Sequence, residues 1–351
     1  MVKEIKIKEI STDTLSCEPL IKRVKNGELL CVVQQGGVGE PMPENRVNVY
    51  HSRDNGESWF GGESIYPETG KAVYATELQA HGDEITAYLA VHSGGFLDCK
   101  NVVVKSFDNG YTWKETGSAP HFPTHAFMRG AIKTRNNQIV MPYHYFGITQ
   151  EEYERVMNDK NLPIKNIAHA QAKTCETGVL IREANGEDWK RYTACVIDMT
   201  KYGMTWSEPT IAQTKDDQII MLMRHERTGF LYRSHSTDGG KTWSEFTQTD
   251  IPNPTNKVKL IALSKDRIAL VHTPNGKLNE EGYGRREPFE MWISCDGMKT
   301  WAEKIRLTNF PDEYHYSDGF YEDGHVRLVE EHNRHTVLYF DIEIDKQVHQ
   351  V

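Results

Sequence analysis

An eight-residue phrase occurs four times along this 351-residue chain. It reads SRDNGESW at 52–59, SFDNGYTW at 106–113, STDGGKTW at 236–243 and SCDGMKTW at 294–301. A shorter GMTW that ends at Trp206 is interpreted as a worn fifth copy. Repetition of one phrase along a chain is typical of repeat architectures, in which each copy belongs to one supersecondary unit.

The phrase has the composition of a tight turn between two strands. Its aspartate can accept hydrogen bonds from turn amides, its glycine tolerates a positive φ, and its tryptophan can pack beneath the turn. We therefore assign the repeats a structural role and no catalysis.

Short apolar runs that read as β-strands lie between the repeats. They are rich in β-branched residues and follow turn signals such as Asn26-Gly27 or Asn136-Asn137. The six runs are 27–35, 83–92, 137–146, 217–225, 266–273 and 324–332. Six units of about four strands each predict an all-β, six-bladed β-propeller, with residues 1–351 as a single domain.

Two further segments have predicted places in this architecture. The opening stretch EIKIKEI, residues 4–10, alternates apolar and charged residues with period two. We expect it to add a strand to the last blade and so close the ring. Residues 147–172 are predicted to form a polar, short helical insertion in blade three.

The charge and the opening residues exclude several classes of partner. A formal net charge of -9 argues against a nucleic-acid or anionic-membrane surface, which needs clustered Lys and Arg. The first residues contain no apolar run of the length of a secretory signal or membrane helix, so a cytoplasmic location is expected. No cofactor and no metal is expected, because the six cysteines form no CxxC pair. The expected partner is an oligosaccharide or glycoside, and a homo-oligomer is one option.

Polar residues at the ends of the apolar strands are the candidate site residues. In a propeller the inner strands converge on a central channel, so we expect these side chains to meet at one mouth of it. In chain order they are Glu18, Gln35, Glu77, His92, His125, Arg129, Tyr143, His144, Glu208, Arg224, His272, Arg285, Arg286, Tyr314, Tyr316 and Glu331.

The repeats and the strand pattern together resemble the sialidase (neuraminidase) superfamily, whose Asp-box (BNR) repeats decorate a six-bladed propeller. The resemblance covers most of the chain from Pro19 to Asp341. It implies a glycoside hydrolase that is exo-acting on a sugar in a central axial pocket.

Three stretches carry the resemblance at the level of single residues. Glu208 matches the glutamate that activates the family's nucleophile, and Tyr316, in Tyr316-Ser317-Asp318, matches the nucleophilic tyrosine. Arg224 matches one arginine that binds the substrate carboxylate, and Arg285 or Arg286 matches another. The chemistry is coherent, because a phenol with a pKa of ~10 needs a neighbouring carboxylate to take its proton.

The chain departs from the family at two positions. Cys17-Glu18-Pro19 stands where the family has Arg-Ile-Pro, so a glutamate replaces a carboxylate-binding arginine and would repel a sugar carboxylate. The acid/base aspartate is also missing, and its loop offers only Glu40 and Glu44. We therefore expect an acidic or non-sialic-acid sugar, with Glu18, Glu40 or Glu44 as general acid.

Two other functions are compatible with the same pattern. In a polysaccharide lyase or rhamnosidase-type enzyme, His125 and Tyr143 would act as base and acid, with His144 beside them and His92 and His272 facing them. The second alternative is a propeller that binds glycans at its mouth without catalysis.

Overall fold

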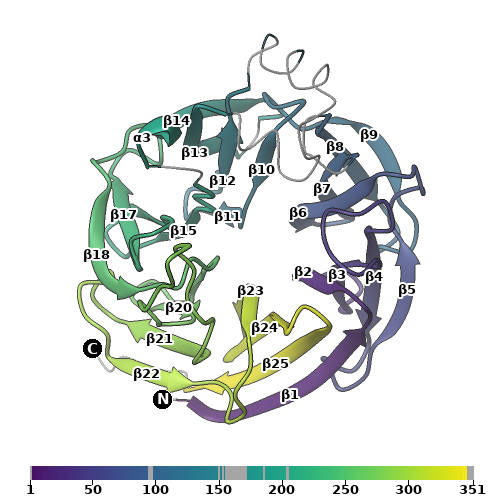
Figure 1. The fold of residues 1–351 in the computed structure, drawn as a ribbon. Helices are drawn as coiled ribbons and strands as arrows, with labels where there is room; N and C mark the ends of the chain where they lie inside the picture. The colour runs from purple at the N-terminus through teal and green to yellow at the C-terminus, as the bar shows by residue number, and fades with distance from the viewer. Residues whose placement is uncertain are drawn as a thin grey trace.

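Six antiparallel sheets stand around a central axis in the computed structural model (Figure 1). The structure describes residues 2–93, 98–148, 151, 154, 172–184, 186–202 and 205–345. The predicted six-bladed propeller is confirmed.

Each blade is formed by consecutive strands, with the innermost strand first. Blade one contains β2 (Ser16–Arg23), β3 (Leu29–Gln35), β4 (Arg46–Ser52) and β5 (Phe60–Ser64). Blade two contains β6 (Ala72–His81), β7 (Glu84–His92), β8 (Lys100–Ser106) and β9 (Lys114–Ser118). Blade three contains β10 (Ala126–Met128), β11 (Ile132–Lys133), β12 (Ile139–Phe146), β13 (Thr174–Arg182) and β14 (Trp189–Asp198).

The second half of the chain forms the remaining three blades. Blade four contains β15 (Thr210–Gln213), β16 (Ile219–Met223), β17 (Phe230–Ser236) and β18 (Thr247–Pro252). Blade five contains β19 (Lys259–Ala262), β20 (Ile268–His272), β21 (Glu290–Ser294) and β22 (Glu303–Arg306). Blade six contains β23 (Tyr314–Glu322), β24 (His325–His332), β25 (Thr336–Ile344) and β1 (Val2–Thr12).

The six apolar runs predicted from the sequence are the second strands of the six blades. β3, β16 and β20 are buried along their whole length. A second strand is covered on both faces by the neighbouring blades, so its sequence is continuously apolar instead of alternating. This is why these strands were the easiest to find.

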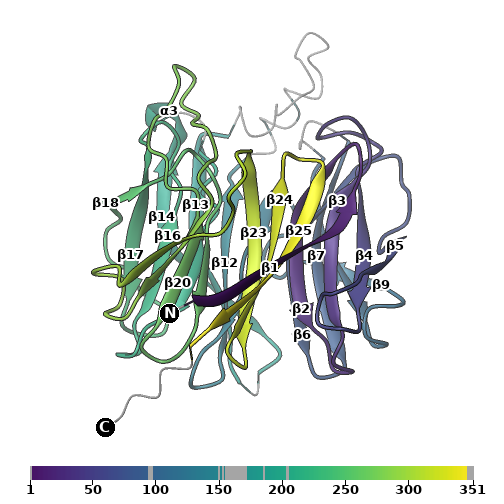
Figure 2. The same ribbon diagram turned by 90° about the horizontal axis from the view of Figure 1, so that it is seen from below.

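The N-terminal strand closes the ring, as predicted. β1 pairs antiparallel with β25, with Ile5 opposite Ile342 and Ile7 opposite Phe340. Figure 2 shows β1 lying beside β25 at the side of the molecule. The half-buried Ile5 and Ile7 also pack against the hydrophobic core between blades five and six, which joins the first and last strands of the chain.

The four repeats form the turns between the third and fourth strands of their blades, in the structural role that we assigned. In the second copy, Asp108 Oδ1 accepts from the Thr112 amide at 2.9 Å, and Ser106 Oγ accepts from the Gly110 amide at 2.9 Å. The Trp113 indole donates to the Gly110 carbonyl oxygen at 2.8 Å. These bonds satisfy turn amides that would otherwise lack partners.

The interpretation of GMTW as a fifth repeat is wrong. Trp206 lies after β14 and before β15, where no third-to-fourth strand turn occurs. The corresponding turn of blade three joins β13 to β14 and ends at Trp189, in the sequence NGEDW. The GMTW stretch shares the Gly-x-Thr-Trp ending of the repeats but has Met199 and Lys201 where the repeats have the Ser and Asp that bind the turn amides.

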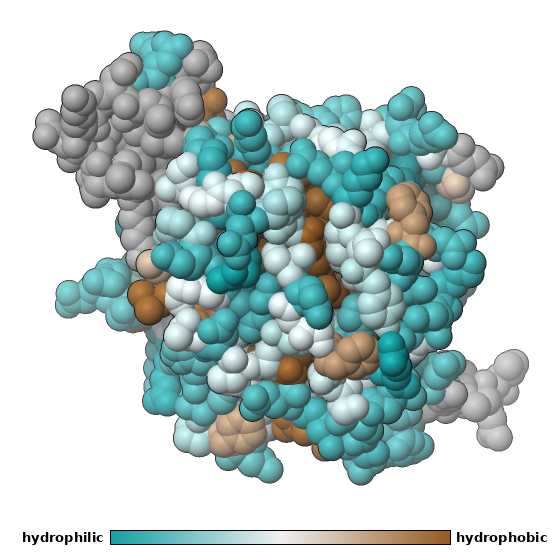
Figure 3. All heavy atoms as spheres, turned by 90° about the vertical axis from the view of Figure 1, so that its right-hand side faces the viewer, coloured by the Kyte–Doolittle hydropathy of each residue, from teal (hydrophilic) through white to brown (hydrophobic). Residues whose placement is uncertain are grey.

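The predicted insertion at 147–172 lies mostly outside the described residues. In the described part of blade three, the short helix α3 (Met199–Tyr202) follows β14. No helix among the described residues combines the length and hydropathy needed to cross a membrane. The side of the ring that carries β5 and β9 is mostly hydrophilic, with scattered hydrophobic patches (Figure 3).

Candidate functional site

The inner strands run in the same direction along the axis, so their first residues meet at one mouth of the channel. A cavity of about 240 Å³ lies there, and residues from all six blades line it. The lining residues are Glu18, Glu40, Pro41, Tyr74, Phe127, Trp206, Glu208, Arg224, Tyr283, Tyr316 and Arg334. Five of the expected site residues therefore come together around one cavity: Glu18, Glu40, Glu208, Arg224 and Tyr316.

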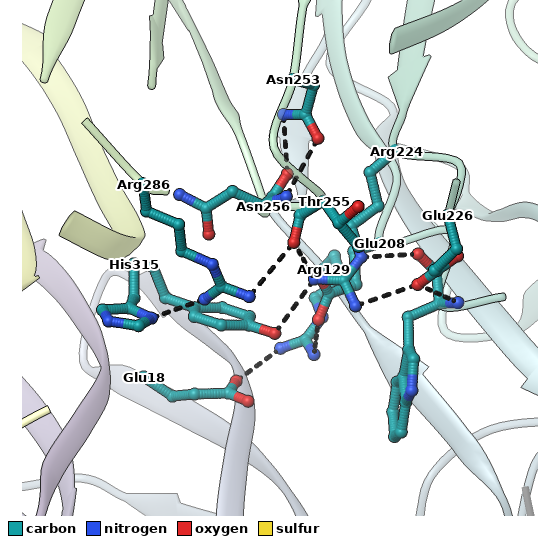
Figure 4. A network of polar contacts seen from close by, with 12 residues as sticks. Glu18, Arg129, Glu208, Arg224, Glu226, Asn253, Thr255, Asn256, Arg286 and His315 are labelled. Atoms are coloured by element: carbon teal, nitrogen blue, oxygen red, sulfur yellow. Dashed lines mark hydrogen bonds and ion pairs between the residues drawn. The ribbon is translucent and has the colours of Figure 1, made fainter. Parts of the chain in front are cut away.

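Two carboxylates face each other across this cavity, bridged by an arginine. Glu18 belongs to blade one and Glu208 precedes the inner strand of blade four, on the opposite side of the ring (Figure 1). Arg129, between β10 and β11, donates from Nη1 to Glu18 Oε2 at 2.9 Å and from Nη2 to Glu208 Oε1 at 3.2 Å. Figure 4 shows this bridge.

The backbone holds both glutamates in an uncommon conformation. Glu18 has a φ of 46° and Glu208 a φ of 37°, and each is followed by a proline. A non-glycine residue rarely has a positive φ, and a residue before proline normally adopts an extended conformation. Backbone strain of this kind clusters at functional sites, where the surrounding structure enforces it.

Arg224 joins the candidate base to the candidate nucleophile. Its Nη1 lies 2.8 Å from Glu208 Oε2 and donates to the Tyr316 hydroxyl at 3.3 Å. Its Nη2 donates to Glu226 Oε1 at 3.2 Å, and its Nε donates to the Trp206 carbonyl oxygen at 2.9 Å. Every nitrogen of this guanidinium group is therefore committed to a protein acceptor.

The surrounding charges set the protonation states of Glu208 and Tyr316. Burial raises the pKa of Glu208, but the guanidinium groups of Arg224 and Arg129 outweigh it and leave the pKa below its usual range. Burial, reinforced by the charge of Glu208, raises the pKa of Tyr316 well above that of free tyrosine. At neutral pH the carboxylate is ionised and the phenol keeps its proton.

Two further cations lie beside the Tyr316 ring. Lys257 Nζ is 5.1 Å from the ring centroid, and the guanidinium carbon of Arg286 is 5.9 Å from it. Arg286 donates to the Thr255 carbonyl oxygen at 3.1 Å and also contacts His315. Burial lowers the pKa of both cations.

Arg334, from the turn between β24 and β25, lines another part of the cavity wall. Its guanidinium group pairs with Glu40 and lies 3.7 Å from Glu331 Oε1. Glu331 is fully buried, and its Oε2 accepts from the Glu18 amide at 3.0 Å. Burial raises the pKa of Glu331 to about 7.

Several predicted site residues lie away from this cavity. Arg285 is exposed and pairs with Glu287, whereas its neighbour Arg286 reaches Tyr316. Glu44 is exposed and lines a different hollow, and Glu77 lines a cavity at the opposite end of the channel. Gln35 is buried against Ser16 and Tyr50, and Tyr314 is stacked on Phe289.

The residues of the lyase hypothesis are not gathered around the cavity. His92 stacks on Tyr74 and His144 on Phe127, so these two imidazoles lie behind the aromatic wall. His272 is buried against Trp292, and Tyr143 donates to Glu176. His125 is buried just before β10 and is not among the lining residues. This geometry does not support a histidine-centred mechanism.

Seven side chains of the site do not follow from the sequence analysis. Tyr74 and Phe127 lie in the inner strands β6 and β10, Lys257 lies just before β19, and Glu226 lies in the loop between β16 and β17. Arg334 lies in a hairpin turn, Tyr283 lies in a long loop, and Trp206 was interpreted as part of a repeat. Only the Trp206-Ser207-Glu208 adjacency was a signal that could have placed one of them. Among the residues that the structure describes, no group of three His, Cys, Asp or Glu side chains is arranged to hold a metal ion.

Comparisons with known proteins agree with this architecture. The family model for BNR repeat-like domains matches residues 27–328. The chain matches no curated protein sequence. A protein of unknown function from Dyadobacter fermentans has a similar structure, with a TM-score of 0.73 and 15% identity, over 98% of this chain and 99% of that chain.

Two sialidases are also structurally similar. A Hadza microbial sialidase gives a TM-score of 0.68 at 15% identity, over 95% of this chain and 66% of that chain. The Trypanosoma rangeli sialidase gives a TM-score of 0.67 at 15% identity, over 96% of this chain and 56% of that chain. The chain therefore spans only part of either enzyme. At this identity the likeness establishes the fold alone. Because the family model covers most of the chain, the protein belongs to the family of BNR repeat-like domains and has the sialidase-like six-bladed propeller fold.

Proposed function

We propose that this protein is a glycoside hydrolase that removes terminal sugar residues in its axial cavity. The observation that carries the proposal is the shared contact of Arg224, whose Nη1 reaches both the Glu208 carboxylate and the Tyr316 hydroxyl. A carboxylate and a phenol held together inside a cavity are the parts of a base-activated nucleophile.

In the first step, the Tyr316 oxygen would attack the anomeric carbon while Glu208 takes the phenolic proton. The raised pKa of Tyr316 means that a free phenolate is scarce, so proton loss must accompany formation of the carbon–oxygen bond. The bond to the leaving group breaks, and a carboxylic acid protonates the departing oxygen. Water then cleaves the glycosyl–tyrosine bond with the roles reversed, as microscopic reversibility requires.

Glu40 is our candidate for the acid that protonates the leaving group. It lines the cavity beside Arg334, apart from the Glu18–Arg129–Glu208 bridge. Because Glu40 is ion-paired with Arg334, it must bind a proton before it can act as an acid. Glu18 is instead bridged by Arg129 to Glu208, the candidate base. Loss of an acid slows substrates with poor leaving groups more than activated aryl glycosides, and Glu40→Gln tests this point.

The size of the cavity supports attack on single terminal sugars. At about 240 Å³ it is smaller than the ~300–1,000 Å³ of pockets that hold drug-sized ligands. A polymer chain would need a groove that extends beyond a hollow of this size.

Turnover of a panel of aryl glycosides and acidic oligosaccharides tests the proposal. Tyr316→Phe and Glu208→Gln should each lower kcat by roughly 10²–10⁴-fold, the range for a lost acid–base or nucleophilic group. Tyr111→Phe and Glu63→Gln make the same chemical changes on the outer strands and turns and should leave turnover unchanged. Wild-type turnover by Tyr316→Phe would contradict the mechanism. Sugar binding without any turnover would favour a glycan-binding propeller.

A further inference from the structure

The charge that lines the axial cavity is not the charge that an acidic ligand requires. Among the described residues, three carboxylates line it, from Glu18, Glu40 and Glu208, against two guanidinium groups, from Arg224 and Arg334. With all three carboxylates ionised, the lining has one more negative than positive charge, and Arg129, which is buried and does not line the cavity, bridges two of them. An anionic ligand would enter against this balance.

The two arginines that line the cavity, and Arg129 beside it, are already paired with protein carboxylates. Arg129 holds Glu18 and Glu208, Arg224 holds Glu208 and Glu226, and Arg334 holds Glu40 and Glu331. Arg286 contacts Thr255 and His315, and neither Arg286 nor Lys257, the two cations beside the Tyr316 ring, lines the cavity. A sugar carboxylate would have to displace an existing ion pair in order to be bound by an arginine that lines the cavity.

The same lining is suited to a ligand rich in hydroxyl groups. Carboxylates accept hydrogen bonds from hydroxyl donors, and such charge-assisted bonds are stronger than neutral ones. Tyr74, Phe127, Trp206 and Tyr283 supply aromatic surface against which the C–H faces of a sugar ring can pack. A neutral pyranose offers both kinds of group.

We propose that the axial cavity accepts an uncharged sugar residue, with Glu18 supplying the negative charge beside the reacting carbon that a carboxylated sugar would bring with it. The inference rests on the proposed function for the identity of the reacting carbon. It explains why a glutamate stands at the start of blade one, in a backbone conformation that only strong local constraint maintains.

The proposal is also consistent with tyrosine as the nucleophile. A neutral nucleophile avoids repulsion from a negative charge beside the anomeric carbon, and here the protein supplies that charge. The Glu18 carboxylate contributes to the field at the Tyr316 hydroxyl, since it is one of the groups that favour the protonated phenol. The same negative charge would stabilise a transition state with positive character at the anomeric carbon.

Binding of matched sugar pairs tests the inference directly. The probes are the methyl glycosides of glucose and galactose, each paired with its uronic acid counterpart, and binding is measured by titration calorimetry at neutral pH. In each pair that binds, we expect the wild-type protein to bind the neutral member at least tenfold more tightly. Glu18→Gln should reduce that preference at least threefold, and Glu63→Gln, the same change on the outer strand of the same blade, should not.

The outcomes separate this inference from the proposed function. Equal or tighter binding of the uronic acid by the wild-type protein would overturn the inference and leave hydrolysis intact. If Glu18→Gln keeps the wild-type preference for the neutral sugar, the proposal that Glu18 supplies the discriminating negative charge is overturned. If that variant does not fold, Glu40→Gln replaces it, because Glu40 is the other lining carboxylate outside the nucleophile pair. Neutral-sugar binding without turnover would overturn hydrolysis alone, and no binding of any probe would overturn both.

Discussion

Single residues of the site are held by partners that come from other blades. Glu18 in blade one is bound by Arg129 of blade three and by Glu331 of blade six. Removing one partner of a buried ion pair leaves the other charge without compensation, which is costly. The site is therefore sensitive to changes in residues that never touch a ligand.

Glu331 gives the site a pH-dependent contribution to stability. Burial raises its pKa to about 7 from the ordinary 4.5 of a glutamate, so the folded state holds a proton that the unfolded state releases. Between these two values the folded protein binds more protons, and the contribution of Glu331 to stability falls as pH rises. Ionisation of Glu331 should lower the free energy of unfolding by on the order of 3 kcal/mol in total.

Glu331→Gln should remove this dependence. Glutamine keeps the shape of the side chain but cannot ionise, so the free energy of unfolding should change less between about pH 5 and about pH 8 than in the wild-type protein. Denaturant unfolding at both pH values measures the difference, with Glu63→Gln as the exposed control. The same slope in wild type and Glu331→Gln would show that the buried carboxyl does not titrate in this range.

At the residue scale, sequence patterns identified the parts of the site that lie at strand ends. Arg224 was found because it follows an apolar second strand, whereas Glu208 and Tyr316 were found because their stretches resemble those of the sialidase superfamily. Arg334 and Lys257 were missed because turns and loops carry no periodicity, and their direction depends on the packing of the ring. His92 and His144 were misplaced because a residue at the end of a buried strand can point between blades as easily as toward the axis.

Among the elements, two of the repeat turns pack closely against the neighbouring blade. A Cβ built on Gly56 would lie 2.0 Å from the Tyr339 ring of blade six, and one on Gly110 would lie 2.0 Å from Leu30 of blade one. Both glycines have a positive φ. In these two copies the glycine is therefore required by close approach between blades as well as by turn conformation, whereas the fourth copy has Met298 at the same position with a φ of 64°.

Gly56→Ala and Gly27→Ala separate these two requirements. Gly27 has a φ of +90°, close to the +92° of Gly56, but nothing lies within 4 Å of a Cβ added there. Both variants bear the backbone strain, whereas Gly56→Ala also overpacks the contact with Tyr339. Gly56→Ala should lose about 1–3 kcal/mol more stability than Gly27→Ala in denaturant unfolding. Equal losses of stability in the two variants would mean that the Tyr339 ring moves aside without an energetic cost.

At the scale of elements, the second strands were predictable and the inner strands were not. β2 and β23 contain register shifts next to Glu18 and Tyr316, and the first strand of blade three is divided into β10 and β11 around Arg129. Site residues thus occupy the irregular parts of inner strands, where neither alternation nor a continuous apolar run appears. The sequence of Trp189 was a clearer repeat ending than that of Trp206, because NGEDW shares Asn, Gly and Glu with the first repeat.

For the whole molecule, one strand joins the beginning of the chain to its end. β1 covers the edge of β25, which would otherwise present unpaired backbone groups. Deleting residues 2–12 removes the partly buried Ile5 and Ile7 as well as the pairing. We expect a loss of about 3–5 kcal/mol and a Tm lower by roughly 4–7 °C, with aggregation through the exposed edge.

Thermal unfolding and light scattering of the truncated chain check this expectation. Lys6→Ala is the control, since Lys6 is exposed on the same strand and should change stability by less than about 0.5 kcal/mol. An unchanged Tm without aggregation in the truncated chain would show that the other strands hold the ring without β1.

The most direct test of the account is covalent trapping of the proposed intermediate. The protein is incubated with the 2-deoxy-2-fluoro glycosyl fluoride of the neutral sugar that binds most tightly, and the adduct is located by intact mass and peptide mapping. The account predicts one sugar per protein on the Tyr316 oxygen, and none in Tyr316→Phe. An adduct on Glu18, Glu40 or Glu208, or turnover of the compound by Tyr316→Phe at the wild-type rate, would contradict it.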